Sequence, residues 1–123
     1  MTNLSSFFEI PVSDFERATT FYSGLFDVKL EGLEVHGTTM AFFPRKSPEA
    51  GSGAIVCGDG YTPSTNGVVL YLDGGRDLAS RLNKVEKLGG KVTVSKTRIS
   101  DEAGYFAQFI DTEGNRMALH SMT

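Results

Sequence analysis

The first predicted strand, residues 7–12, carries two different faces. One face is purely apolar and consists of Phe8, Ile10 and Val12. The opposite face is mixed and consists of Phe7, Glu9 and Pro11. Because successive side chains of a strand point to opposite sides, the apolar set favours packing beneath a helix. Pro11 lacks an N–H donor and belongs at the end of the strand.

An amphipathic helix is predicted to follow this strand directly. Ser13 and Glu16 match a capping box, and Asp14 in the first turn suits the positive end of the helix dipole. Apolar residues at helical spacing form the expected buried stripe, which consists of Phe15, Ala18, Phe21, Tyr22 and Leu25. Gly24 stands where the helix is expected to stop.

Short strands separated by turn formers complete the first half of the chain. The predicted strands are residues 28–30, 38–43 and 54–57. His36-Gly37 is a turn signal before the second of them. Residues 58–67 are rich in Gly, Thr, Ser and Asn, which predicts a linker between two halves.

The second half repeats the order of the first. Its opening strand again has two faces. The apolar face consists of Val68, Leu70 and Leu72, and the opposite face consists of Gly67, Val69 and Tyr71. Asp73 is the expected helix cap, and the buried stripe consists of Leu78, Leu82, Val85 and Leu88. A strand at 92–96, a loop at 98–104 and a hairpin of strands 105–110 and 116–120 are predicted to follow.

This duplication predicts an α+β fold of two tandem βαβββ modules in a single domain. The first module spans about 5–58, the linker about 59–66 and the second module about 67–123. Neither half alone buries enough apolar surface to be comfortably stable. We therefore expect one curved mixed sheet with the helices on its outer face. Its other face would form a cup that accepts a ligand.

The composition excludes several classes of partner. The chain has 123 residues and a net charge of −3, and its basic residues are scattered, so no nucleic-acid or membrane partner is expected. No apolar run approaches the roughly 20 residues of a membrane span, and the first residues do not resemble a signal peptide. The single Cys57 forms no internal disulfide, which suits the reducing cytoplasm.

Two motifs resemble the vicinal oxygen chelate superfamily of glyoxalases, bleomycin-resistance proteins and dioxygenases. The first is Phe8-Glu9-Ile10-Pro11-Val12-Ser13-Asp14, followed by Ala18, Phe21-Tyr22 and Gly24-Leu25-Phe26. The second is Asp111-Thr112-Glu113-Gly114-Asn115-Arg116, which is similar to the Asp-x-x-Gly-Asn hairpin of that family. The resemblance implies paired modules around a cup and a homodimer. It does not settle the reaction, because members of one fold run different chemistries.

The resemblance also implies four positions at which metal-dependent members place His, Glu or Gln. In this sequence those positions fall on Phe7, Val56, Gly67 and Ala118. None of these side chains offers a donor atom, and catalytic metal sites usually need three protein ligands. We therefore expect no metal and no other cofactor.

Strand alternation leaves a few chemically useful side chains on the expected cup face. Glu9 and His120 are candidates for acid–base catalysis, because a partly buried carboxylate and an imidazole can exchange protons near neutral pH. The alternative for Glu9 is a structural pair with Arg116, and for His120 a frayed or strand-capping role near the C-terminus. Residues expected to contact a ligand are Phe7, Val69, Tyr71 and Arg98. Arg98 would clamp a carboxylate or phosphate, or be merely an exposed charge.

Three functions remain open from the sequence. The first is a small-molecule binding protein that holds a partly apolar ligand, in the manner of the bleomycin-resistance members. The second is a metal-independent lyase or isomerase that uses Glu9 or His120 as its base. The third is a metal-dependent glyoxalase or dioxygenase, which the four donor-free positions disfavour.

Overall fold

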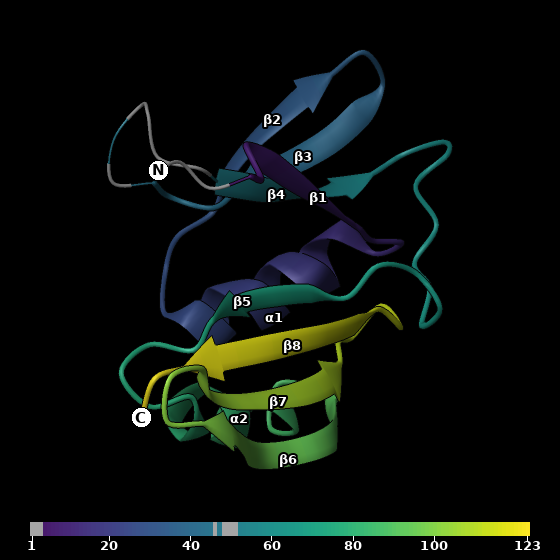
Figure 1. The fold of residues 1–123 in the computed structure, drawn as a ribbon. Helices are drawn as coiled ribbons and strands as arrows, with labels where there is room; N and C mark the ends of the chain where they lie inside the picture. The colour runs from purple at the N-terminus through teal and green to yellow at the C-terminus, as the bar shows by residue number, and fades with distance from the viewer. Residues whose placement is uncertain (1–3, 46, 48–51) are drawn as a thin grey trace.

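The computed structural model describes residues 4–45, 47 and 52–123 (Figure 1). The first module consists of β1 (Phe7–Pro11), α1 (Phe15–Phe26), β2 (Glu31–Val35), β3 (Thr38–Phe42) and β4 (Ser52–Cys57). The second consists of β5 (Leu70–Asp73), α2 (Ala79–Val85), β6 (Lys91–Ser100), β7 (Gly104–Ile110) and β8 (Arg116–Ser121).

Both modules have the same topology. The strand orders are β1-β4-β3-β2 and β5-β8-β7-β6, with one parallel pair in each four-stranded sheet, β1 with β4 and β5 with β8. The predicted α+β fold of two tandem βαβββ modules is confirmed. The sheet is nevertheless split, because no ladder joins β1 to β5 in the part of the chain that the structure describes.

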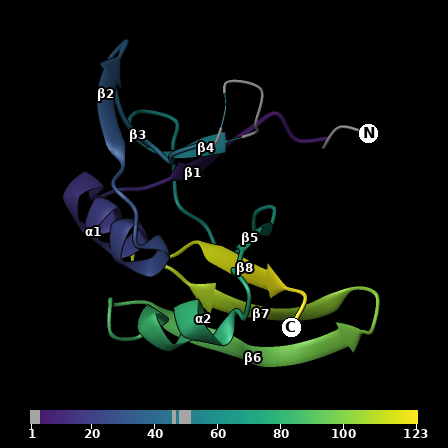
Figure 2. The ribbon, with the colours of Figure 1, turned by 90° about the vertical axis from the view of Figure 1, so that its left-hand side faces the viewer.

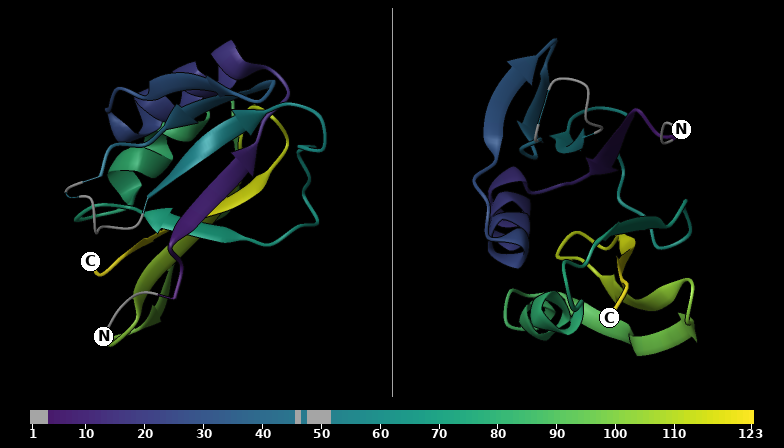
Figure 3. Two further views of the ribbon diagram at one scale, coloured as in Figure 1. Left: turned by 90° about the horizontal axis from the view of Figure 1, so that it is seen from above. Right: turned by 60° about the vertical axis from the view of Figure 1, so that its left-hand side comes forward.

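The inner edge strands of the two sheets, β1 and β5, face each other across a narrow gap. Residues of β1, β5, β8 and the linker line this gap, which has a volume of about 240 Å³. Both helices lie on the same side of the two sheets (Figures 2 and 3). The opposite, helix-free faces therefore carry the side chains that the alternation assigned to the cup.

Helix α1 holds the two modules together. It lies alongside the seam and packs against both sheets (Figure 2). The ring of Phe21 lies 6.0 Å from that of Phe109 in β7, and Tyr22 meets Phe43 edge-on at 5.8 Å. One continuous core results, so each module completes the burial that the other lacks.

The predicted alternation of helix-facing and outward-facing side chains is confirmed in β1 and only partly in β5. Ile10 and Val12 are buried on the helix side, and Phe8 packs against them. In the second module Leu72 is buried and Leu70 packs on the core, but Val68 is 97% exposed. Strand β5 starts only at Leu70, so Val68 belongs to the linker.

The predicted ends of α1 were wrong at both sides. The N-cap is Asp14, whose carboxylate accepts a hydrogen bond of 3.0 Å from the N–H of Arg17, so Ser13 is not the cap. Gly24 does not stop the helix, which ends at Phe26 and is followed by the C-cap Asp27 in a left-handed conformation with φ of 52°. A Cβ on Gly24 would lie 2.9 Å from Leu88, so this glycine allows the close approach of the segment after α2.

Three further predictions of local structure were wrong. Asp73 does not cap α2, which begins after Leu78 without a side-chain cap; its carboxylate binds the N–H of Gly75 instead. Residues 28–30 form no strand. Strand β6 runs to Ser100, so Arg98 lies in a strand and not in a loop. None of the helices in the described residues is both long enough and apolar enough to span a membrane.

Candidate functional site

A broad hollow lies on the helix-free face of the second sheet. Its volume is about 730 Å³, and it is lined by Tyr71, Leu72, Asp73, Ile99, Ala103, Phe106 and His120. We call it the module 2 hollow. Strand register explains why these residues meet: Asp73 pairs with His120 across β5 and β8, and Phe106 pairs with His120 across β7 and β8. Paired residues of neighbouring strands present their side chains on the same face.

Aromatic and aliphatic side chains form the walls of this hollow. The rings of Tyr71 and Phe106 lie 6.4 Å apart at an angle of 48°. Tyr71 is 50% exposed and Ile99 is 48% exposed, so the walls present large apolar side chains to solvent. The hollow therefore offers apolar contact area that water covers when no ligand is present.

His120 lines the module 2 hollow together with two other titratable residues, Tyr71 and Asp73. Its Nε2 lies 2.5 Å from the carbonyl oxygen of Ala103. A carbonyl oxygen only accepts, so Nε2 carries the hydrogen and Nδ1 of a neutral ring has the free lone pair. The bond fixes the tautomer and the ring, which leaves Nδ1 able to accept a proton or a hydrogen bond.

Glu9 does not share this hollow with His120. It lies on β1 in the gap between the two sheets, where Arg116 is a neighbour that also lines the gap. The hydroxyl of Tyr61 donates a hydrogen bond of 3.1 Å to its carboxylate. The structure therefore brings Tyr71 and His120 together but holds Glu9 in a separate place, beside the linker.

The other expected ligand contacts are also dispersed. Phe7 lies on the first sheet and packs its ring 6.1 Å from that of Phe42. Val69 immediately precedes β5 and does not line the module 2 hollow. Arg98 pairs with Tyr105 in the strand register, which puts it on the helix side of its sheet, and it forms an ion pair with Asp101. Of the four, only Tyr71 reaches the hollow.

The four positions that correspond to metal ligands in relatives were also located. Pro11 pairs with Val56 in the first module as Tyr71 pairs with Ala118 in the second, which supports the correspondence of Val56 with Ala118. Both side chains are fully buried hydrocarbon. Within residues 4–45, 47 and 52–123, no group of three or more His, Cys, Asp or Glu is arranged to hold a metal ion. The residues present do not fit the metal site of the metal-dependent relatives.

Of the seven residues that line the hollow, the sequence alone assigned only Tyr71 and His120 to a site. Phe106, Ile99 and Ala103 lie in or beside a hairpin whose strands were not assigned to a face. Phe106 could have been assigned to this face, because it lies two positions before Gln108 in the same strand. Gln108 pairs with Ala118, one of the four positions that correspond to metal ligands. Ile99 had none, since its position depends on the register shifts of β6.

Paired βαβββ modules with a hollow on the helix-free face define a protein of the vicinal oxygen chelate type. The sequence profile of the Glyoxalase/Bleomycin resistance protein/Dioxygenase superfamily matches residues 5–119. The chain belongs to this superfamily. No curated protein matches the chain significantly.

Solved structures share the fold at low sequence identity. A glyoxalase/bleomycin resistance protein from Albidiferax ferrireducens T118 is 18% identical with a TM-score of 0.71, over 97% of this chain and 98% of that one. Glyoxalase I of Leishmania major is 19% identical with a TM-score of 0.68, over 98% and 88%. The fosfomycin resistance protein FosX of Listeria monocytogenes is 18% identical with a TM-score of 0.65, over 100% and 93%. At these identities the likeness shows the fold alone.

Proposed function

We propose that this protein binds a small, partly apolar molecule in the module 2 hollow and that it does so without the metal site of the metal-dependent members of its superfamily. The observation that carries the proposal is the convergence of Tyr71, Phe106 and His120 on one hollow of about 730 Å³. A pocket of this size with mostly apolar walls and a few polar groups is typical of small-molecule sites. The imidazole and Asp73 supply the polar groups that orient a ligand.

The metal-free part of the proposal rests on the chemistry of four side chains. Phe7, Val56, Gly67 and Ala118 carry no oxygen, nitrogen or sulfur in their side chains. A metal ion bound between these four positions would therefore receive no side-chain ligand from any of them. The binding function therefore relies on shape, aromatic contacts and hydrogen bonds.

We further propose that the protein is a homodimer. Several large apolar side chains remain well exposed in the single chain, including Phe7 at 45%, Leu33 at 54% and Tyr71 at 50%. A second copy that covers part of this surface would also narrow the hollow and shield it from water. Light scattering of the purified protein would give a mass of about twice 13.3 kDa, and a monomer at all concentrations would contradict this part.

A second candidate function is metal-independent acid–base catalysis by His120. The observation that favours it is the bond from Nε2 to Ala103, because a fixed tautomer leaves Nδ1 ready to act as a base. Glu9 contributes less to this candidate, since it lies in the gap between the sheets and is bound by Tyr61. If this reading is right, His120→Gln abolishes turnover of an identified ligand while its affinity stays within about 3-fold.

The binding proposal is tested by NMR titration of the ¹⁵N-labelled protein with neutral single-ring aromatics, namely phenol, catechol and benzyl alcohol. We expect the amide shifts to concentrate at Ala103, Phe106 and His120. Tyr71→Ala should weaken binding by about 5-fold or more, because it removes an aromatic contact. Arg98→Gln is the matched control, since Arg98 lies outside the hollow and should have no effect. Shifts scattered over other surfaces, or equal losses in both variants, would contradict the proposal.

A further inference from the structure

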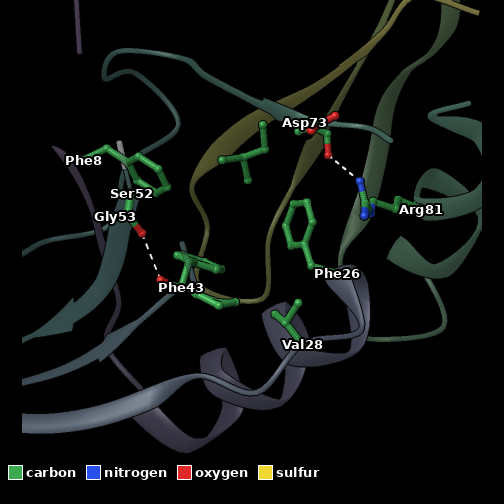
Figure 4. Close-up of a pocket in the computed structure, with 10 residues that line it drawn as sticks. Phe8, Phe26, Val28, Phe43, Ser52, Gly53, Asp73 and Arg81 are labelled. Atoms are coloured by element: carbon green, nitrogen blue, oxygen red, sulfur yellow. Dashed lines mark hydrogen bonds between the residues drawn. The ribbon is translucent and has the colours of Figure 1, made fainter. Parts of the chain in front are cut away.

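A second cavity lies on the opposite, helix side of the sheets, where the two modules meet (Figure 4). Its volume is about 280 Å³, and it is lined by Phe8, Phe26, Val28, Phe43, Pro44, Ser52, Gly53, Leu72, Asp73 and Arg81. We call it the seam pocket. It touches the module 2 hollow only through the backbone neighbours Leu72 and Asp73, which border both. The remaining lining residues of the two cavities are different.

Three phenylalanine rings make the seam pocket an aromatic site. The rings of Phe8 and Phe43 lie 5.8 Å apart, and Phe26 meets Phe43 edge-on at 6.1 Å. Gly53 gives the ring of Phe8 its room, because a Cβ at this position would lie 2.3 Å from that ring. All three rings are only partly buried. A planar aromatic group can stack against these rings or meet their edges with favourable geometry.

Arg81 borders this aromatic pocket with a guanidinium that is already held in place. Its guanidinium carbon lies 5.0 Å from the centre of the Phe26 ring, and Nη1 donates a hydrogen bond of 2.7 Å to the carbonyl of Asp73. A Cβ on Gly75 would lie 3.0 Å from Nη1 of Arg81, so a glycine at this position leaves room for the guanidinium. Across the described residues, Arg81 forms no ion pair with a carboxylate. A guanidinium has five N–H donors, so several are left for a ligand.

Two further basic residues lie near Arg81. An adjoining groove of about 360 Å³ shares Phe26 and Arg81 with the seam pocket and adds Arg76 and Lys84. Its two acidic residues are Asp27 and Asp77, and Asp77 is paired with Lys96 at 2.9 Å. The groove therefore has three basic residues against two acidic ones. Asp73 also lines the seam pocket and adds a negative charge; its carboxylate accepts a hydrogen bond from the N–H of Gly75, and Arg81 binds its carbonyl and not its carboxylate.

We infer that the seam pocket is a second binding site, and that it takes a small aromatic carboxylate. The ring of the ligand lies among Phe8, Phe26 and Phe43, and its carboxylate binds the free N–H groups of Arg81. A planar guanidinium suits a carboxylate because two parallel hydrogen bonds can form. This inference does not depend on what the module 2 hollow binds.

The wild-type protein tests the inference with two probes of the same shape. 3-Phenylpropionate and 3-phenylpropan-1-ol share the aromatic body and differ in the charged head. In an NMR titration we expect shifts from the acid at Phe26, Gly53 and Arg81, and an affinity at least about 10-fold above that of the alcohol, as a charged hydrogen bond predicts. Equal affinities for the two probes, or shifts from the acid confined to Ala103, Phe106 and His120, would overturn the inference.

Two arginine variants separate the role of Arg81 from general charge. Arg81→Gln should reduce the affinity for 3-phenylpropionate to that of the alcohol and leave the affinity for the alcohol unchanged. Arg98→Gln removes the same charge from β6, outside both cavities, and should change neither affinity. An equal loss in both variants would overturn the inference. If Arg81→Gln does not fold, the comparison of acid and alcohol on the wild-type protein still decides.

Discussion

The hydroxyl of Tyr22 donates a hydrogen bond of 2.6 Å to the carboxylate of Asp111, and this bond crosses from the first module to the second. Tyr22 is fully buried in α1, and Asp111, directly after β7, is 4% exposed. Burial raises the pKa of Tyr22 well above its usual range, and the charge of Asp111 raises it further. The phenol therefore remains a donor at every physiological pH. The pair fixes the position of α1 over the seam.

Tyr22→Phe should lower the free energy of unfolding by about 1–3 kcal/mol. The change removes the O–H donor and leaves a buried carboxylate with fewer partners, of which the Asn115 side chain at 3.0 Å is one. Urea denaturation at neutral pH measures the effect. Tyr61→Phe is the matched control, because its bond is to the exposed carboxylate of Glu9 and its loss should have little effect on stability. Equal stabilities of the two variants would contradict this account of the pair.

Glu113 forms a second link between the modules, and it is the one that should respond to pH. Its carboxylate accepts hydrogen bonds from the backbone N–H groups of Ser13 at 3.0 Å and Asp14 at 2.8 Å, and from Arg17 at 2.8 Å. Burial raises the pKa of Glu113, but these bonds outweigh it and hold the pKa at about 2, against a usual 4.5. The negative charge also lies at the positive end of the α1 dipole.

A group with a lowered pKa stabilises the fold when it is charged, so the contribution of Glu113 is complete above about pH 4.5 and is lost as the pH falls towards about 2. Glu113→Gln should therefore lower the Tm at pH 7, and the difference from wild type should shrink across that window. Thermal unfolding at several pH values measures this, with Glu16→Gln in the exposed first turn of α1 as the control. A difference that stays constant down to about pH 2.5 would show that the charge of Glu113 is not the cause.

The fold was predictable because the pattern that specifies it is local and occurs twice. The apolar set of Ile10 and Val12 and the stripe of Tyr22 and Leu25 are read directly from residue spacing, and all four are buried. The contacts that join the modules were not predictable in this way. Glu113 lies 100 residues from Ser13 along the chain, and no periodicity relates them. The capping box failed for the same reason, because Glu113 binds the N–H groups of Ser13 and Asp14.

The site was predictable only as far as strand alternation determines it. Alternation puts Tyr71 and His120 on one face, and the structure brings both to the module 2 hollow. It also puts Glu9 on the helix-free face, but it cannot show that the first sheet is separated from the second by a gap. Arg98 was misplaced because β6 continues four residues beyond the predicted strand 92–96, and the pairing with Tyr105 turns this side chain away from the hollow.

Gly53 should be among the least replaceable residues of the first sheet. A Cβ at Gly53 would lie 2.3 Å from the ring of Phe8, so Gly53→Ala must displace that ring. We expect a loss of about 1–3 kcal/mol, as for other overpacked sites, and weaker binding of 3-phenylpropionate in the seam pocket. Gly67→Ala is the matched control, since no atom lies within 4 Å of its added Cβ. Urea denaturation of both variants compares them, and equal stabilities would mean that Phe8 moves at no cost.

The donor-free positions Phe7, Val56, Gly67 and Ala118 lead to a prediction about metal ions. Tag-free protein should contain far less than one equivalent of Zn²⁺, Ni²⁺ or Fe after dialysis, as measured by plasma mass spectrometry. An ion that binds only the folded protein stabilises it by about 2.7 kcal/mol at 100 times its Kd. Because we expect no such site, excess Zn²⁺ or Ni²⁺ should leave the Tm unchanged to within about 1 °C.

Each of the two histidines can still bind metal weakly by itself. The variants His36→Gln and His120→Gln identify such binding, because the binding disappears when the histidine responsible is removed. A true site behaves differently. One equivalent of metal that survives dialysis, together with a Tm that falls on addition of EDTA, would show that other side chains hold an ion in this fold. The proposal of a metal-free binding protein would then be wrong, and metal-dependent glyoxalase or dioxygenase chemistry would become the better account.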